Sequence, residues 1–336
     1  MTSTKFDVLG VGNAIVDVLT HASDEFIAEQ NEKYGMMKGA MTLIDTERAE
    51  QLYGDIGQAT EMSGGSAANT IAIVAGLGAE AAFIGKVAED QLGDVFAHDL
   101  KATGVHFSTP RLKNNHPTGR CFILVTPDAQ RTMNTYLGAA AEFEAEDVQE
   151  NVVSAAKVSY MEGYLFDKEA AKDGYRRVSE IARANGREVA LSLSDPFCVE
   201  RHREDFQDLV DHHVDIVFAN EQEIMALYQT ETFEEAQEIV RSKCKLVALT
   251  RGPKGSVIIS GNQTIKIDAI EPSELKDTTG AGDAYAGGFL YGYTNGYDLK
   301  ACGDLGSLLA TEIISQMGPR TDKDLKNFVE GLKKAS

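Results

Sequence analysis

The segment GAGD, formed by Gly280, Ala281, Gly282 and Asp283, places small residues around one carboxylate just ahead of a stretch with helical character. At the start of a helix the backbone N–H groups lack intrahelical acceptors, and the helix dipole favours negative charge. Glycine lets an anion approach these groups without an intervening side chain. Asp283 would lie beside that anion, where it can accept a proton from an attacking hydroxyl. The segment therefore predicts phosphoryl transfer, in which positioning and charge neutralisation supply most of the rate.

A tight turn with Asp283 as a helix-capping acid is the alternative interpretation, and such a cap is worth about 1 kcal/mol. Gly287 and Gly288 lie inside the expected helix, where each glycine costs up to about 1 kcal/mol relative to alanine. Glycines at such positions indicate close packing or the close approach of a ligand. They favour a functional site over a cap alone.

The elements that must position this segment are those of a layered α/β protein. Helical patterns such as TIAIVAGLG and EEAQEIVRSKCK lie between short β-rich runs. Strands that alternate with helices predict a mostly parallel sheet covered by helices on both faces. The β-rich runs span residues 6–12, 81–87, 121–126, 157–162, 188–194, 214–220 and 246–252.

Two regions, 13–59 and 108–141, break this alternation. The second contains PTGRCFILVTPDAQRTMNTYL, which predicts two strands around a polar PDAQR turn. We expect the two regions to meet as a small β-rich lid domain, and residues 1–12, 60–107 and 142–336 to form a large nucleotide-binding and catalytic domain. Ligands of such folds bind beyond the carboxyl ends of the strands.

Length, composition and charge narrow the function classes. The 336 residues can bury a large core, and a net charge of -20 argues against a nucleic-acid partner. The N-terminus MTSTKFDVLGVG lacks the features of a secretory signal, and no apolar run approaches about 18 residues, which predicts a cytoplasmic protein without a membrane partner. Four widely spaced cysteines without a CxxC pair predict reduced core thiols.

Two long signatures resemble those of the ribokinase, or PfkB, family of carbohydrate and nucleoside kinases. DTTGAGDAYAGGF at 277–289 resembles its C-terminal signature, and GGSAANTIAIVAGLGAEAAFIGKVAEDQLGDVF at 64–96 its N-terminal one. The similarity extends from GNAIVDV at 12 to MGPRT at 317. It implies a three-layer α/β/α fold with a lid, and ATP-dependent phosphorylation of an alcohol. Asp283 would be the base, and the N–H groups of 280–283 would bind the charge on the transferred phosphoryl group.

The resemblance also implies an acceptor site. It assigns Asn13 and Asp17 in GNAIVD, and Gly64, Gly65 and Asn69 in GGSAAN, to substrate binding. A carboxylate at Asp17 would accept hydrogen bonds from two vicinal sugar hydroxyls. From residue types alone, Asp17 is equally a solvated acid at a strand end, and GGSAAN a helix N-terminal turn.

The nucleotide side is implied in the same way. Asn220 and Glu223 in NEQE match an NxxE motif that holds Mg²⁺ through water and orients the phosphates. Thr250 and Gly252 in LTRGPKG match positions that contact ATP, and Arg131 in the lid turn would close over the phosphates as a cationic clamp. Without the resemblance, NEQE is a polar helix start and Arg131 a solvated loop residue.

Asp277 and Thr279 match positions at which several relatives bind a monovalent cation, often K⁺, beside the anion hole. The sequence alone gives no independent support for this site. Activity that does not change when K⁺ is replaced by a large organic cation would count against it.

Within the family, several segments resemble the branch that phosphorylates adenosine at its 5′-hydroxyl. These are GNAIVD with GGSAANT, PTGRC, YLGAAAEF, SLSDPF at 192–197 and MGPRT. Asp195 departs from the pattern, because a small residue is expected there. A kinase for ribose, fructose or another nucleoside is the alternative, as is a nucleoside-binding protein without activity. The expected partners are the acceptor and ATP, and the chain would be a monomer or homodimer.

An apolar lid surface is needed to stack a purine. The lid residues that could supply it, or could instead form the lid's own core, are Phe122, Leu124, Met133, Tyr136 and Leu137. Two other nucleotide-binding patterns fit poorly. GVGNAI at 10–15 lacks the third glycine of a dinucleotide-binding loop, and GxxxxGK[ST] is absent.

Overall fold

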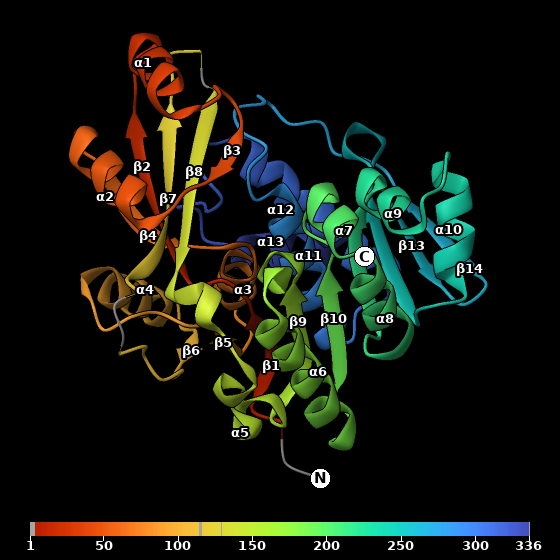
Figure 1. Ribbon diagram of the computed structural model, residues 1–336. Coiled ribbons are helices and arrows are strands. Elements are labelled where there is room, and N and C mark those ends of the chain that lie inside the picture. The colour runs from red at the N-terminus through yellow and green to blue at the C-terminus, as the bar shows by residue number, and fades with distance from the viewer. Residues whose placement is uncertain (1–3, 114–115, 129, 336) are drawn as a thin grey trace.

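The computed structural model describes residues 4–113, 116–128 and 130–335. Residues 1–3 of the predicted large domain, 114–115 and Ala129 of the predicted lid, and residue 336 therefore lie outside the described residues. A nine-stranded sheet forms the centre of the molecule (Figure 1). Its strands lie in the order β14 (Gln263–Ile267), β13 (Ser256–Ser260), β12 (Leu246–Thr250), β11 (Ile216–Asn220), β10 (Glu188–Ser192), β9 (Ala156–Glu162), β1 (Phe6–Val11), β5 (Ala81–Ile84) and β6 (His106–Phe107).

The seven strands from β12 to β6 run parallel, and β13 and β14 extend the sheet as an antiparallel hairpin. The chain begins at β1, moves outward to β5 and β6, and then returns to β9 on the other side of β1. The order of the strands therefore reverses between β1 and β9. Ligands of doubly wound folds bind at such a switch point, beyond the carboxyl ends of the strands.

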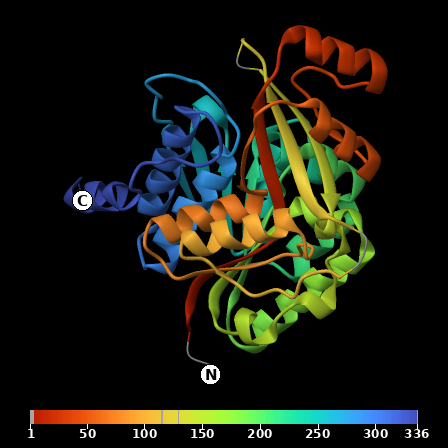
Figure 2. The same cartoon turned by 90° about the vertical axis from the view of Figure 1, so that its left-hand side faces the viewer.

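Helices cover both faces of this sheet, as its nearly continuous apolar strands predicted. One apolar core packs against α5 (Glu150–Val153), α6 (Glu169–Ala184), α7 (Pro196–Arg201), α8 (Arg203–His212), α9 (Glu221–Tyr228) and α10 (Phe233–Arg241). The opposite core packs against α3 (Ser66–Gly76), α4 (Gln91–Ala102), α11 (Ala281–Thr294) and α12 (Leu299–Ile314), and α13 (Lys326–Ala335) follows α12 (Figure 2). Short 3₁₀ turns are η1 (Ala139–Glu142), η2 (Ala145–Asp147), η3 (Gly163–Asp167) and η4 (Gly252–Lys254).

A second sheet stands beside the first (Figure 1). Its order is β3 (Met41–Leu43), β8 (Arg131–Gly138), β7 (Thr118–Val125), β2 (Ile15–His21) and β4 (Thr60–Gly64). Strands β7 and β8 are antiparallel, as the pattern around the PDAQR turn predicted. Both predicted lid segments contribute to this sheet, and β4 adds five residues that follow the first segment.

Two helices that accompany the second sheet were missing from the sequence interpretation, which expected a small β-rich lid there and named no helix in it. They are α1 (Asp24–Tyr34) and α2 (Thr46–Asp55). Each has a recognisable start, because the side chain of Ser23 accepts from the N–H of Phe26 and that of Asp45 accepts from the N–H of Arg48. These N-cap residues were a usable helix signal.

Side chains of the second sheet alternate between two environments. Phe122, Leu124 and Tyr136 are buried in the core that also contains residues of α1 and α2. The expectation that these three could stack a purine is therefore wrong, and its alternative, a role in the lid's own core, is correct for them. The opposite face carries Ile15, Cys121, Ile123 and Val125, with Met133 and Leu19 partly buried against them. By alternation Leu137 belongs to the same face as Met133.

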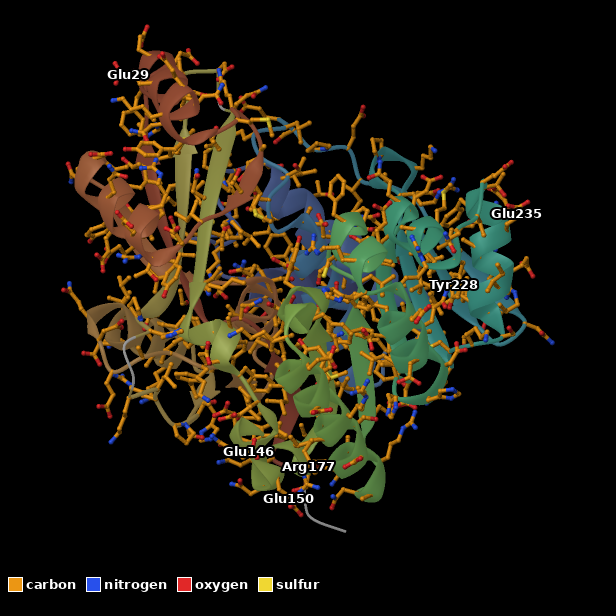
Figure 3. The ribbon with its side chains drawn as sticks, in the orientation of Figure 1. Glu29, Glu146, Glu150, Arg177, Tyr228 and Glu235 are labelled. Carbon is orange, nitrogen blue, oxygen red and sulfur yellow. The ribbon has the colours of Figure 1, made fainter. Side chains whose placement is uncertain are left out.

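Several acidic side chains lie far apart on the molecule. Figure 3 shows Glu29 at the tip of α1, Glu235 on α10, and Glu146 and Glu150 together at the base of the molecule, with Arg177 beside Glu150. All four cysteines are buried free thiols, as expected. No helix in the described ranges is long and apolar enough to span a bilayer.

Candidate active site

Residues assigned to the site gather where the parallel strands end. Asn13 follows β1, Glu162 ends β9, Asn220 ends β11 and Thr250 ends β12. Asn13 and Glu162 are joined at the β1–β9 switch point, because the backbone N–H and Nδ2 of Asn13 both donate to Glu162 Oε1 at 2.8 Å. The carboxyl edge of the central sheet is therefore the edge that carries the site.

Asp283 lies in the first turn of α11 and faces the start of α3. The hydroxyl of Ser66 donates to its Oδ1 at 2.6 Å, and Nδ2 of Asn69 donates to its Oδ2 at 3.3 Å. Both contacts join segments more than two hundred residues apart, since 217 and 214 positions separate the partners. The two family signatures thus meet at this carboxylate.

Asp283 and Asp17 both have pKa values shifted toward neutrality. Burial raises the pKa of Asp283 to about 6, against the lowering effects of the Ser66 and Asn69 hydrogen bonds and the charge of Arg320. Burial raises the pKa of Asp17 to about 7, opposed by the charges of Arg320 and Arg131. A base poised near neutral pH suits proton abstraction from a hydroxyl.

The start of α11 has no side-chain cap. Gly280 adopts a left-handed conformation with φ of 77°, and a Cβ there would lie 2.6 Å from Pro319. The N–H of Ala281 donates to the carbonyl of Thr278 at 3.2 Å, so that amide is engaged within the turn. Gly282 is exposed, and a Cβ added to it would meet no atom within 4 Å. The space over Gly282 and the N–H of Asp283 is therefore open to an anion.

Gly287 and Gly288 have a packing role. A Cβ on Gly287 would lie 2.8 Å from Ile73 of α3, and one on Gly288 would lie 2.7 Å from Leu309 of α12. The two glycines let α11 fit closely between these helices. Of the two explanations offered by the sequence, close packing is the one that applies.

Asp17 lies on β2 with its side chain directed over β4. It is 7% exposed, and a Cβ on Gly64 would lie 2.3 Å from its Oδ1. Gly65 begins α3 with φ of 98°, and a Cβ there would lie 2.3 Å from the carbonyl oxygen of Asn13. The glycine pair is therefore required by the close approach of Asp17 and Asn13, and all of these residues form one cluster.

Glu162 is a member of this cluster that the sequence interpretation missed. It is 1% exposed, and its Oε2 accepts from the N–H of Ala67 at 2.6 Å, which holds the first turn of α3. Burial raises its pKa to about 7. Oδ1 of Asn13 is buried without a hydrogen-bond partner in the described part of the chain and is free to accept from a ligand. The only signal for Glu162 was its place at the end of a predicted strand.

Asn220 and Glu223 form a capping box at the start of α9. Asn220 donates from its backbone N–H and from Nδ2 to the Glu223 carboxylate at 2.8 and 2.6 Å, and Glu223 N–H donates to Asn220 Oδ1 at 2.8 Å. Burial raises the pKa of Glu223 to about 7. The polar helix start, the simpler interpretation of NEQE, is thus present.

Thr250 and Gly252 lie beside this box at the end of β12. Thr250 pairs in register with Asn220, and its hydroxyl donates to the carbonyl of Ala219 at 3.5 Å. Gly252 is exposed with φ of 54° and no neighbour within 4 Å of an added Cβ. Four of the five residues assigned to the nucleotide side therefore lie together where two adjacent strands, β11 and β12, end, and Arg131 lies on the second sheet.

Arg131 reaches from the second sheet to the segment that precedes α11. Its Nη2 lies 2.7 Å from Oδ2 of Asp277 in an ion pair whose side chains are 7% and 6% exposed. The Asp277 carboxylate also accepts from the N–H of Thr279 and the N–H of Gly318, both at 3.0 Å. Nε and Nη1 of Arg131 are buried and have no hydrogen-bond partner in the ranges described. Arg131 is thus buried at the sheet rather than solvated in the turn.

Comparison with known proteins shows the family, because residues 28–326 match the model of the pfkB family carbohydrate kinases. The chain belongs to that family. It is therefore an ATP-using phosphotransferase with an alcohol acceptor, and the fold and the two signatures agree with this assignment.

Three similar proteins have informative names. The structure titled adenosine kinase from Sinorhizobium meliloti is 50% identical, with 99% of this chain and 100% of that chain covered and a TM-score of 0.90. A probable sugar kinase protein from Rhizobium etli is also 50% identical, with 99% of both chains covered and a TM-score of 0.89. Adenosine kinase from Saccharomyces cerevisiae is 29% identical over 92% of this chain and 95% of its own length.

Proposed function

We propose that this pfkB-family protein transfers the γ-phosphoryl group of ATP to the 5′-hydroxyl of adenosine, giving AMP and ADP. The observation that carries the proposal is the meeting of Asp283, at an uncapped helix start, with Asn69 and Ser66 of the other signature. The 50% identity to an adenosine kinase of Sinorhizobium meliloti supports adenosine as the acceptor.

In the proposed reaction Asp283 accepts the proton of the acceptor hydroxyl. The hydroxyl oxygen forms a bond to the γ-phosphorus as the bond from that phosphorus to the bridging β–γ oxygen breaks, and ADP leaves. The N–H groups of Gly280, Gly282 and Asp283 would bind the negative charge that moves onto the transferred group, whereas the N–H of Ala281, which the resemblance also assigned to this role, is engaged by the Thr278 carbonyl. Gly282 gives the least obstructed approach, because no atom lies within 4 Å of an added Cβ.

The acceptor would lie between Asp17 and Asp283. Asp17 would accept from the two ribose hydroxyls, and Oδ1 of Asn13, which lacks a partner among the described residues, would accept from a further donor. Gly64 and Gly65 would let the sugar approach the backbone, and Asn69 would hold the carboxylate of the base.

The face of the second sheet that carries Asp17 is apolar around it. By strand alternation Ile15 and Leu19 lie on the same face of β2 as Asp17, and Cys121 and Ile123 continue this face on β7. Such a surface suits a purine ring better than a hydroxyl-rich sugar. We propose that this sheet, with α1 and α2, is the lid predicted from 13–59 and 108–141, and that the remaining chain is the large domain.

A sugar kinase is the second candidate. The observation in its favour is the polar floor at the switch point, where Asn13 and Glu162 offer buried acceptor oxygens. The equal identity to a probable sugar kinase of Rhizobium etli points the same way. A free sugar would use such acceptors and leave the apolar lid face without a ligand.

ATP would lie over the ends of β11 and β12, with Thr250 and Gly252 at the nucleotide and Arg131 at its phosphates. The described residues contain no group of three or more His, Cys, Asp or Glu side chains arranged for a metal. That fits Mg²⁺, which keeps several waters and binds through substrate phosphates with few protein ligands. We propose that Asn220 and Glu223 would hold it through water, and that the ion, when bound, neutralises phosphate charge.

Asp277 and Thr279 fit a monovalent cation poorly while Arg131 is paired with Asp277. The Asp277 carboxylate already accepts hydrogen bonds from two backbone N–H groups and forms an ion pair with Arg131. We propose K⁺ only for a state in which Arg131 has moved to the phosphates and left Asp277. Replacement of K⁺ by tetramethylammonium should then change the rate more in Arg131→Met than in the wild type. Equal responses of the two proteins would remove this proposal.

We further propose that the chain works in the cytoplasm as a monomer or homodimer, in keeping with its four buried free thiols. Light scattering of the purified protein distinguishes the two assembly states.

The test of function is the initial rate of ADP release from MgATP with adenosine, other nucleosides, ribose and fructose. We expect kcat/KM for adenosine to exceed that for every sugar by orders of magnitude. A preference for a free sugar would replace the first candidate by the second. No turnover with any acceptor would contradict both and leave the nucleoside-binding alternative.

A further inference from the structure

Arg320 is a buried cation that reaches the acceptor cluster from the C-terminal segment. Its Nε donates to Oδ1 of Asn69 at 3.4 Å, and its Nη1 donates to Oδ2 of Asp99 on α4 at 3.1 Å. The side chain is 17% exposed. Its Nη2 is buried and has no hydrogen-bond partner in the part of the chain that the structure describes. The residues that the sequence assigned to the site do not include Arg320.

We propose that Arg320 is a positioning residue for phosphoryl transfer, which turns the Asn69 amide toward Asp283 and holds a fixed positive charge beside Asp283 and Asp17. The inference rests on the proposed function, because it assumes that Asp283 is the base.

The orientation of Asn69 follows from the chemistry of its neighbours. A guanidinium group can only donate hydrogen bonds, so the Asn69 atom that faces Arg320 must be the carbonyl oxygen. The amide NH₂ is then directed to Oδ2 of Asp283, which it meets at 3.3 Å. An ionised carboxylate can only accept, so this arrangement satisfies both ends of the amide. Without Arg320, only the Asp283 carboxylate would favour this orientation over its flipped form.

The position of Arg320 is itself fixed. Asp99 Oδ2, its ion-pair partner, also accepts from the N–H of Ser63 at 2.8 Å and from the Ser63 hydroxyl. Ser63 directly precedes Gly64, which lies under Asp17. The side-chain amide of Gln316 donates to the carbonyl of Arg320. The guanidinium group is therefore held by α4 and by its own segment before any ligand binds.

The electrostatic effect acts on two carboxylates at once. The charge of Arg320 lowers the pKa of both Asp283 and Asp17, against the larger effect of burial. The other titratable groups that face Asp283 are Asp17 on β2, Tyr160 and Glu162 on β9, and Tyr164 in η3. None of these is a cation, so removal of Arg320 leaves the base among neutral and acidic groups.

The first experiment compares kcat/KM for adenosine from pH 5 to 9 in the wild type, Arg320→Gln and Arg320→Lys. In Arg320→Gln we expect kcat/KM at pH 7 to fall by about tenfold or more. The acidic limb of the profile, which is the pH range in which kcat/KM falls as the pH is lowered, should move to higher pH by on the order of one pH unit. Lysine keeps the charge but cannot reproduce the forked contacts to Asn69 and Asp99. Arg320→Lys should therefore keep the wild-type limb while kcat falls.

Arg241→Gln is the matched control. Arg241 on α10 is 19% exposed, and donates to Glu238, to the Gly261 carbonyl and to Thr264. Its helix, marked by Glu235 in Figure 3, lies at the far edge of the molecule from the lid. This variant should lose similar hydrogen bonds without a change in the pH profile. Restoration of Arg320→Ala activity by added guanidinium chloride would show that the missing group acts locally.

Thermal unfolding gives a readout that does not need turnover. Arg320 stabilises Asp283 and Asp17 only when they are ionised, so the difference in Tm between wild type and Arg320→Gln should be larger at pH 8 than at pH 5. A purely structural arginine paired with Asp99 would give the same difference at both values. If Arg320→Gln does not fold, Arg320→Lys and Asp99→Asn, which releases the guanidinium group, test the same contacts.

A wild-type rate and acidic limb in Arg320→Gln would overturn the inference while leaving the proposed function intact. A wild-type protein without turnover on any acceptor would contradict the proposed function, and the Tm difference would still decide whether Arg320 acts on the two carboxylates.

Discussion

Helices α9 and α11 both carry residues that the sequence assigned to the site, but their first turns are built in opposite ways. Asn220 and Glu223 satisfy the start of α9 through a reciprocal capping box. Gly280 begins α11 in a left-handed conformation with no side-chain cap. A capped start has its N–H groups occupied, whereas an uncapped one leaves them to an external acceptor. The comparison favours the uncapped start of α11 over the capped start of α9 as the proposed anion site.

Asp283→Asn is the variant with the largest expected effect, and it tests whether the first turn of α11 differs in role from that of α9. If Asp283 is a base and not a cap, kcat should fall by on the order of 10² or more while KM for the acceptor stays nearly constant. Steady-state ADP release measures both constants. The matched control is Asp298→Asn, because Asp298 caps α12 by accepting from the N–H of Ala301 at 2.8 Å. Equal kinetics for the two variants would make Asp283 a cap as well.

Gly282→Ala separates activity from stability. The added methyl group meets no protein atom, so the helix should gain up to about 1 kcal/mol in unfolding free energy. The same methyl group would obstruct the transferred phosphoryl group, and we expect kcat/KM to fall by roughly tenfold or more. Gly54→Ala on α2 is the control, because Gly54 also has no neighbour within 4 Å of an added Cβ. It should gain stability and keep full activity, and a Gly282→Ala protein with full activity would refute the open anion site.

The pH dependence of activity and of stability should have opposite signs. Asp283 and Asp17, with pKa values of about 6 and about 7, must both be ionised to act, so kcat/KM should fall by about tenfold between pH 7 and 6 and by about a hundredfold for each pH unit below 6. Both values lie above the ordinary value of 3.8, so the folded state binds protons more tightly than the unfolded chain. The unfolding free energy should therefore decrease as pH rises from 5 to 8. Rate profiles and thermal melts that move together would contradict the burial of these groups.

Glu223→Gln tests the capped helix and should have the smallest effect. Glutamine can still accept from the N–H of Asn220, so we expect about 1 kcal/mol or less in lost unfolding free energy. A role in holding Mg²⁺ through water would add a loss of about threefold to tenfold in kcat/KM and a higher Mg²⁺ requirement. Thr232→Ala, at the cap of α10, is the control for the loss of a cap alone. Equal Mg²⁺ titrations of both variants would leave Glu223 with capping only.

Much of the central sheet could be predicted, because its strands are short apolar runs separated by helical patterns. The runs at 6–12, 157–162 and 246–252 correspond to β1, β9 and β12. The hairpin of β13 and β14 was missed. QTIKI in β14 is exposed along most of its length and lacks the apolar signal of a buried strand, whereas SVIIS in β13 is buried and carried that signal. Helices α1 and α2 were missed although Ser23 and Asp45 cap them.

The lid surface shows a different limit of the sequence. The choice of Phe122, Leu124 and Tyr136 for the purine followed hydrophobicity and size, but strand alternation directs them to the face that packs against helices. The face of this sheet that turns toward the proposed site is the face that carries Asp17. The register of β2 with β7 determines which β7 side chains share that face, and β7 lies about a hundred residues further along the chain.

The sequence by itself determined the local chemistry: a glycine-rich helix start with Asp283 in its first turn, a glycine pair at 64–65, and a carboxylate at Asp17 on an apolar strand. Only the tertiary structure decided what these groups meet. Glu162 reaches Asn13 across 149 residues, and Arg320 reaches Asn69 across 251. Glu162 belongs to none of the quoted motifs, and MGPRT, which contains Arg320, does not show what that arginine contacts. A hydrogen bond between distant segments depends on how helices and strands pack and leaves no fixed spacing in the chain.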